Sequence, residues 1–136
     1  MKTPVNVLLI DDSSEDRHIY RRFLERLPTN YVVHEAKDGA SGVEAAARLE
    51  PDCIILDLKL PDQSGFEVLV QLVGEDPPPK IPVIMLTSSV SDTLSKGALW
   101  FGAQQYLIKG RFEAEQLDQA IRDAVARVAA LTPKKS

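Results

Sequence analysis

The sequence has few of the cysteines and none of the long apolar stretches that form disulfides, thiolate metal sites and membrane-spanning helices. Its 136 residues include a single cysteine, Cys53, which excludes an internal disulfide and argues against a metal site built on thiolates. Its two histidines, His18 and His34, have no nearby serine, cysteine or metal-ligand spacing, so neither is expected to be catalytic. No apolar stretch approaches the roughly 20 residues of a membrane-spanning helix, and two aspartates follow the start too soon for a secretory signal. We expect a cytoplasmic protein without membrane contact.

Basic residues do not outnumber acidic ones in this sequence. The formal net charge is −4 and the pI is near 5.2, whereas a nucleic-acid partner calls for a basic face, so we expect no nucleic acid. A chain of 136 residues with 44% hydrophobic content is the size of one ordinary domain with a sizeable core. We expect one domain over residues 1–128 and a short C-terminal tail over residues 129–136.

Strand and helix patterns alternate five times along the chain. Segments with helical spacing, such as Ile19, Phe23 and Leu27, separate short apolar runs rich in valine, isoleucine and leucine. Strands without polar alternation need helices on both faces of their sheet. The pattern predicts an α/β fold, a doubly wound parallel sheet of five strands with five helices. The expected strands are Val5–Ile10, Tyr31–Ala36, Cys53–Leu56, Ile81–Leu86 and Gln105–Ile108.

Helix-capping and turn residues between these segments support the same boundaries. Ser13 to Asp16 fits a capping box that opens the first helix, and Gly39 and Gly65 lie at loop-to-helix junctions.

Four of the apolar runs end on residues able to handle a phosphoryl group: Asp11 and Asp12, Asp57, Thr87, and Lys109. The carboxyl ends of parallel strands share one edge of the sheet, so these residues are expected in one pocket. Three converging carboxylates would raise one another's pKa unless a cation neutralised them, and oxygen ligands suit Mg²⁺. A hydroxyl and an ammonium can hold phosphoryl oxygens during in-line transfer, which leaves Asp57 as the nucleophile.

The motifs around these residues resemble the receiver domain of bacterial two-component response regulators. They are LLIDD at 8–12, IILDLKLPDQSG at 54–65, IPVIMLTS at 81–88 and GAQQYLIK at 102–109, and the likeness runs from about Val5 to Val128. A chance coincidence of all four at the right strand ends is improbable. The resemblance implies a CheY-like, flavodoxin-like fold with strand order 2-1-3-4-5.

The resemblance also implies a phosphoacceptor with a metal site. Asp57 would take a phosphoryl group from a phosphohistidine of a sensor kinase or a histidine phosphotransfer protein. Asp12 and Asp57 would ligate Mg²⁺ directly together with the backbone carbonyl of Lys59, and Asp11 would act largely through water.

A conformational switch is the third implication. Thr87 and Tyr106 would form the switch pair, and Lys109 would bridge Asp57 and the phosphoryl group. The fourth helix, fifth strand and fifth helix would then present an output face to an unknown protein or to a second copy of the chain. We expect a stand-alone response regulator that acts as a binding switch, not as a turnover enzyme.

The sequence departs from the family pattern at two positions beside the pocket. Gly110 stands where the family has proline after the lysine, often through a cis peptide, and we expect Lys109 to reach the pocket through a re-shaped loop. Lys59 stands where many members are uncharged. It either pairs with a pocket carboxylate when metal is absent or is a solvated surface lysine.

Two further features have alternative interpretations. Trp100 and Phe101 are adjacent large rings that cannot both face inward on a helix; either one of them caps the core, or Trp100 lies on the output face and meets a partner or second subunit. The first helix carries Arg17, Arg21, Arg22 and Arg26, which form either a solvated face or part of a kinase-docking surface.

Two other functions compete with the receiver. A haloacid-dehalogenase-like phosphohydrolase also uses an aspartate nucleophile with Mg²⁺, but its second aspartate would stand at Lys59 and the loops are too short for a cap domain. A receiver-like adaptor that binds partners without phosphorylation would explain Gly110 and Lys59. The complete set of pocket residues favours the phosphorylated receiver.

Overall fold

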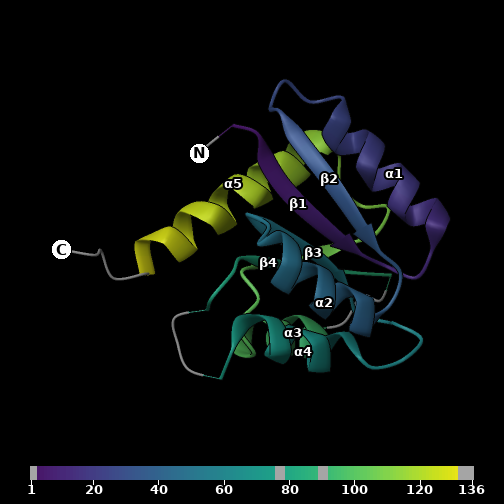
Figure 1. Ribbon diagram of the computed structural model, residues 1–136, viewed down its shortest axis with the longest axis vertical. Coiled ribbons are helices and arrows are strands. Elements are labelled where there is room, and N and C mark those ends of the chain that lie inside the picture. The colour runs from purple at the N-terminus through teal and green to yellow at the C-terminus, as the bar shows by residue number, and fades with distance from the viewer. Residues whose placement is uncertain (1–2, 76–78, 89–91, 132–136) are drawn as a thin grey trace.

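The computed structural model describes residues 3–75, 79–88 and 92–131, with only the backbone of residues 92–95. Within these ranges five strands alternate with five helices (Figure 1). The strands are β1 (Val5–Ile10), β2 (Tyr31–Ala36), β3 (Cys53–Asp57), β4 (Val83–Thr87) and β5 (Gln105–Ile108). The helices are α1 (Ser14–Glu25), α2 (Gly39–Leu49), α3 (Gly65–Val73), α4 (Asp92–Trp100) and α5 (Ala114–Leu131).

The five strands form one parallel sheet in the order β2-β1-β3-β4-β5, which confirms the predicted fold and topology. β2 pairs with one side of β1, and β3 pairs with the other side. The strand order therefore reverses between β1 and β3. In open α/β sheets ligands bind outside the carboxyl ends of the strands at this reversal.

Each face of the sheet is covered by helices, because successive side chains of a buried strand point to opposite sides. Leu9 of β1 and Ile55 of β3 pack with residues of α1 and α5 on one face. Leu8 and Ile54 pack with residues of α2, α3 and α4 on the other. Two buried cores therefore hold the central strands from both sides, so their carboxyl ends keep a fixed spacing.

The strand boundaries differ from the sequence prediction at three ends, the end of β3 and both ends of β4, which finishes at Thr87 instead of Leu86. β3 continues through Asp57, because Leu58 N–H still donates to the carbonyl of Leu86 at 3.0 Å. β4 begins at Val83 instead of Ile81, since Pro82 has no N–H to give to a ladder. Asp57 and Thr87 are thus the last residues of β3 and β4, so their spacing follows from the pairing of these two strands.

Gly65 is required by the close approach of α3 to the end of β3. A Cβ at this position would lie 2.6 Å from the carbonyl oxygen of Asp57 and 2.7 Å from Cα of Leu58. Its own N–H donates to the carbonyl of Leu58 at 2.7 Å. Glycine therefore lets the loop after Asp57 fold back tightly beside the pocket.

The end of α5 falls inside the expected tail. The helix continues through Leu131, so residues 129–131 are helical, and residues 132–136 lie outside the described residues. Over the part of the chain that the structure describes, no helix has the length and apolar character needed to cross a membrane.

Candidate functional site

Three carboxylates converge where β1 and β3 end. Asp11 and Asp12 follow β1, Asp57 ends β3, and each offers an oxygen within 4.8 Å of the oxygens of the other two. Asp11 and Asp57 are buried, with Asp57 only 6% exposed, whereas Asp12 is exposed. The strand-end argument therefore predicted this cluster correctly.

The surroundings of Asp57 disfavour its negative charge. Burial, followed by the negative charge of Asp11, raises the pKa of Asp57 to about 6, although Lys109 and a backbone hydrogen bond act in the opposite direction. That bond comes from the N–H of Lys59, which donates to Oδ1 at 3.3 Å. A cation near Asp57 would stabilise its charged form.

Lys109 supplies such a cation. Its ammonium donates to Asp11 Oδ2 at 2.7 Å, to Asp16 Oδ2 at 2.8 Å and to Asp57 Oδ2 at 3.3 Å. Burial by itself would lower the pKa of Lys109, but the hydrogen bonds to Asp11 and Asp16, with the charge of Asp57, raise it above its usual range. The side chain is 14% exposed, so solvent weakens these interactions little. Lys109 is held charged inside the cluster.

Asp16 is the pocket residue that sequence reasoning missed. The predicted capping box forms only in part: Ser13 is the N-cap of α1, and its Oγ accepts from the N–H of Asp16 at 3.1 Å. The carboxylate of Asp16 does not complete the box, because it binds Lys109, and the N–H of Ser13 donates instead to Asp11 Oδ1 at 2.9 Å. Its position in the sequence could have indicated this role, because Asp16 lies in the first turn of the helix that follows β1, the strand that carries Asp11 and Asp12 at its end.

Thr87 lies at the adjacent strand end, where the sequence predicted it. It ends β4, directly after Leu86, the residue paired with Asp57, and it is buried. Its carbonyl accepts the N–H of Lys109 at 2.7 Å, which ties the end of β5 to the end of β4. Tyr106 of β5 is partly buried and packs against the core on the side of α3 and α4.

Gly110 takes a conformation that glycine favours. Its φ is +78°, and a Cβ there would meet no atom within 4 Å. Among the described residues the cis peptide is Thr3–Pro4, so the peptide after Lys109 is trans. The expectation that Lys109 reaches the pocket through a re-shaped loop is confirmed by its contact with Asp57.

Lys59 does not take the role of an internal counter-ion. Its side chain is exposed, and in the described part of the chain the ion pairs of the pocket carboxylates are made by Lys109. The interpretation that Lys59 pairs with a pocket carboxylate is therefore wrong for this structure. Its backbone stays close to Asp57 because Lys59 bridges to Ser64 within the tight loop before α3.

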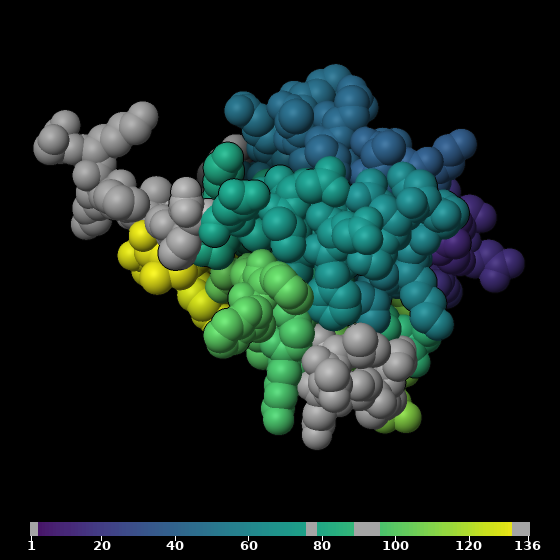
Figure 2. All heavy atoms as spheres, turned by 90° about the horizontal axis from the view of Figure 1, so that it is seen from below, coloured from purple at the N-terminus to yellow at the C-terminus, as the bar shows by residue number. Residues whose placement is uncertain are grey.

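Trp100, the last residue of α4, and Phe101, the residue after it, have different surroundings. The ring of Phe101 packs on Phe66 of α3, with centroids 5.9 Å apart, whereas Trp100 is 86% exposed. Figure 2 shows the end of α4, in green, beside α3, in teal. Core packing is thus the wrong interpretation for Trp100, and the ring of Phe101, which is itself 47% exposed, packs against Phe66 at the surface of the protein.

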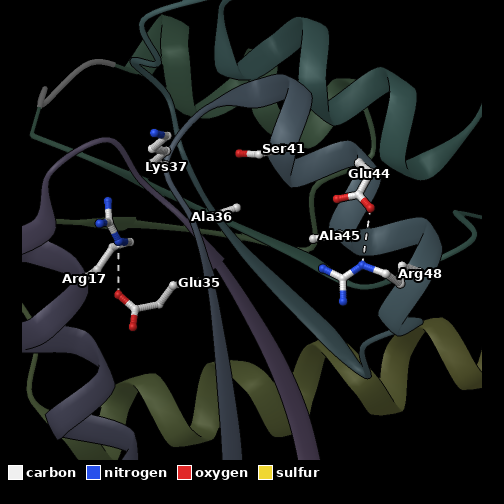
Figure 3. Close-up of a pocket in the computed structure, with 8 residues that line it drawn as sticks. All are labelled: Arg17, Glu35, Ala36, Lys37, Ser41, Glu44, Ala45 and Arg48. Carbon is white, nitrogen blue, oxygen red and sulfur yellow. Dashed lines mark hydrogen bonds and ion pairs between the residues drawn. The ribbon is translucent and has the colours of Figure 1, made fainter.

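The arginines of α1 are partly engaged in ion pairs. Arg17 donates to Glu35 of β2 at 3.0 Å and to the carbonyl of Asp11 at 2.6 Å, and Arg21 also pairs with Glu35. Arg17 and Glu35 line an open hollow of about 390 Å³ between β2 and α2 (Figure 3). A second pair, Arg48 with Glu44, lines the same hollow. Because the carboxylate cluster lies outside it, this hollow is not the candidate site.

The sequence model of the family described as "Response regulator receiver domain" matches residues 7–122. The chain is similar to the transcriptional regulatory protein LiaR of Bacillus subtilis (strain 168), with 41% identity over 120 residues that cover 88% of this chain and 56% of LiaR. It is similar to the nitrate/nitrite response regulator protein NarL of Escherichia coli (strain K12), with 36% identity over 123 residues that cover 90% of this chain and 56% of NarL. It thus spans about half the length of these curated relatives.

Solved structures resemble the whole fold. The signal receiver domain of a putative LuxO repressor protein from Vibrio parahaemolyticus has a TM-score of 0.81 and 28% identity, with 93% of both chains covered. The response regulator domain of Thermotoga maritima CheB has a TM-score of 0.79 and 30% identity, with 90% of this chain and 96% of that chain covered.

Proposed function

The chain belongs to the response regulator receiver domain family, because the sequence model of that family matches residues 7–122, and from this premise we propose that Asp57 is its phosphoacceptor. In this proposal Asp57 takes a phosphoryl group from a phosphohistidine of a sensor kinase or phosphotransfer protein. The phosphorylated chain then binds its partner differently. One phosphoryl group per chain is the product, and there is no turnover of a small substrate.

One observation carries the proposal: a buried carboxylate at a strand end is held in reach of a charged lysine. Asp57 Oδ2 lies 3.3 Å from the ammonium of Lys109, and the strand order reverses beside it. In the transfer, an oxygen of Asp57 forms a bond to phosphorus while the bond from phosphorus to the histidine nitrogen breaks. Lys109 would stabilise the negative charge on the phosphoryl oxygens as this happens.

The donor set fits Mg²⁺. Three carboxylates offer hard oxygen ligands within 4.8 Å of one another at an edge where Asp12 is open to solvent, so waters can complete an octahedron. Asp11, Asp12 and Asp57 would hold the ion together with the carbonyl of Lys59. When bound, it would neutralise the like charges of the cluster and stabilise negative charge on the transferring group.

Thr87 and Tyr106 are the residues that would report phosphorylation to the surface. Thr87 is buried directly beyond the residue paired with Asp57, and in this proposal its hydroxyl moves to engage a phosphoryl oxygen. Tyr106 lies on the adjacent strand, opposite Met85. Its ring would turn inward and change the face made by α4, β5 and α5, where an output protein or second copy would bind.

Acetyl phosphate with Mg²⁺ tests the phosphoacceptor. We expect the wild-type protein to gain the mass of one phosphoryl group, and we expect hydroxylamine to remove it, as it does from an acyl phosphate. The Asp57→Asn variant should gain nothing. Asp62→Asn is the matched control. It removes a carboxylate from the loop after Asp57, and this carboxylate accepts from the N–H groups of Gly39 and Ala40 at the start of α2 and lies outside the cluster. Equal labelling of Asp57→Asn, or no labelling of the wild type, would contradict the proposal.

A further inference from the structure

Lys109 is held on the α1 side of the pocket by two contacts that are shorter than its contact with Asp57. The ammonium has three N–H donors, and all three are used. The bonds to Asp11 and Asp16 measure 2.7 and 2.8 Å, whereas the bond to Asp57 measures 3.3 Å. An incoming phosphoryl oxygen can therefore replace the longest of the three bonds and leave the other two in place.

A closed chain of hydrogen bonds fixes the position of the Lys109 ammonium. Ser13 N–H donates to Asp11 Oδ1, and Ser13 Oγ accepts from the N–H of Asp16. The Oδ2 atoms of both aspartates meet at the ammonium of Lys109. The end of β1, the first turn of α1 and the end of β5 are joined at one nitrogen atom.

The side of Lys109 that faces away from Asp11 leaves its side chain more room. Gly110 has open space around the position of a Cβ, and its φ of +78° is a conformation that glycine adopts easily. A hollow of about 380 Å³ opens beside the ammonium, lined in part by Tyr20, Ser88 and Phe112. Without a partner on the α1 side, the long lysine side chain has room to swing into this hollow.

From this arrangement we propose that Asp16 is a positioning residue for phosphoryl transfer: it anchors the Lys109 ammonium so that one N–H faces Asp57. Among the described residues Asp16 is not part of the carboxylate cluster that could hold a metal, so it acts through Lys109. Its side chain is 33% exposed, which leaves it outside the buried core and makes it a site that tolerates substitution. The inference rests on the proposed role of Asp57 as phosphoacceptor.

The first test separates the rate of transfer from the binding of the phosphodonor. Initial rates of Asp57 phosphorylation are measured against acetyl phosphate concentration for the wild type, Asp16→Asn, and the control Glu15→Gln. Glu15 is an exposed acidic residue in the same helical turn, without a contact to Lys109 among the described residues. We expect Asp16→Asn to lower the maximal rate about tenfold at an unchanged half-saturating concentration, because a misplaced charge weakens the transition state. Glu15→Gln should match the wild type.

The second test measures the contact itself, by urea unfolding of Asp16→Asn in two backgrounds. In the wild-type background the variant should lower the unfolding midpoint, because Lys109 loses an ion-pair partner. In the Lys109→Met background the same substitution should leave the midpoint unchanged or raise it, because Asp16 then faces only the like charges of Asp11 and Asp57. A residue with a merely structural role would lower the midpoint equally in both.

The outcomes distinguish this inference from the proposed function. A maximal rate for Asp16→Asn within twofold of the wild type would overturn the positioning role, as would an equal loss in Glu15→Gln. An equal change of midpoint in both backgrounds would overturn the contact. If the wild type is not modified at Asp57, the proposed function fails, and the unfolding measurements still decide whether Asp16 anchors Lys109.

Discussion

Replacing Asp57 by asparagine should stabilise the metal-free protein, and the gain should grow with pH. The fold raises the pKa of this carboxyl from 3.8 to about 6, mainly through burial and the charge of Asp11. The folded protein thus holds the proton more tightly than the unfolded chain does. The contribution of Asp57 to the free energy of unfolding of the wild type therefore falls as pH rises from about 4 to about 6. The Asp57→Asn variant lacks this titration.

The magnitude follows from the size of the shift. Each pKa unit corresponds to about 1.4 kcal/mol, so a shift of about two units costs the wild type on the order of 3 kcal/mol at pH 8. Part of this cost is already present at pH 4.5, because the carboxyl of the unfolded chain is then ionised. The difference between the two proteins should therefore grow by about 2 kcal/mol between about pH 4.5 and about pH 8. Solvent screening reduces it little, since Asp57 is 6% exposed.

Urea unfolding followed by circular dichroism measures the difference in the presence of EDTA. Trp100 is 86% exposed, so its fluorescence would be a poor reporter of the core. Subtracting the wild type from the variant at each pH cancels the titrations that the two proteins share. A difference that stays constant from pH 4.5 to pH 8, or that shrinks, would refute the argument that the fold disfavours the charge of Asp57.

Three further predictions concern the metal, the loop after Asp57 and the exposed tryptophan. Mg²⁺ at ten times its dissociation constant should raise the free energy of unfolding of the wild type by about 1.4 kcal/mol. The Asp12→Asn variant should respond much less, and an equal response would place the ion elsewhere. Gly65→Ala should cost about 1–3 kcal/mol, because its Cβ would meet backbone atoms, whereas Gly39→Ala meets only the flexible Gln63 side chain and should cost less. Equal unfolding midpoints for the two alanine variants would contradict this. Trp100→Ala should change stability by no more than about 0.5 kcal/mol, and Phe101→Ala should cost more, since its ring packs on Phe66. A large loss for Trp100→Ala in the same unfolding assay would show that its ring is buried.

The sequence by itself determined the fold and the location of the site. Apolar runs without polar alternation indicate strands buried on both faces, and the alternation of strand and helix allows a parallel sheet covered by helices. In such a sheet the strand ends share one edge, so Asp11, Asp57, Thr87 and Lys109 had to come together. Their convergence required no knowledge of side-chain packing.

Only the tertiary structure decided which groups pair inside that site. Asp16 and Lys109 are separated by 93 positions in the chain, and their contact depends on how α1 lies against the end of β5. Local sequence patterns indicate burial and helix starts. From them Asp16 was interpreted as part of a capping box, and Lys59 as a counter-ion of a pocket carboxylate. Ion pairing is decided by distance in the folded chain, which gave three carboxylates to Lys109 and left Lys59 exposed. The same holds for Trp100, because the way α4 packs on the protein decides which of the two adjacent rings contacts Phe66.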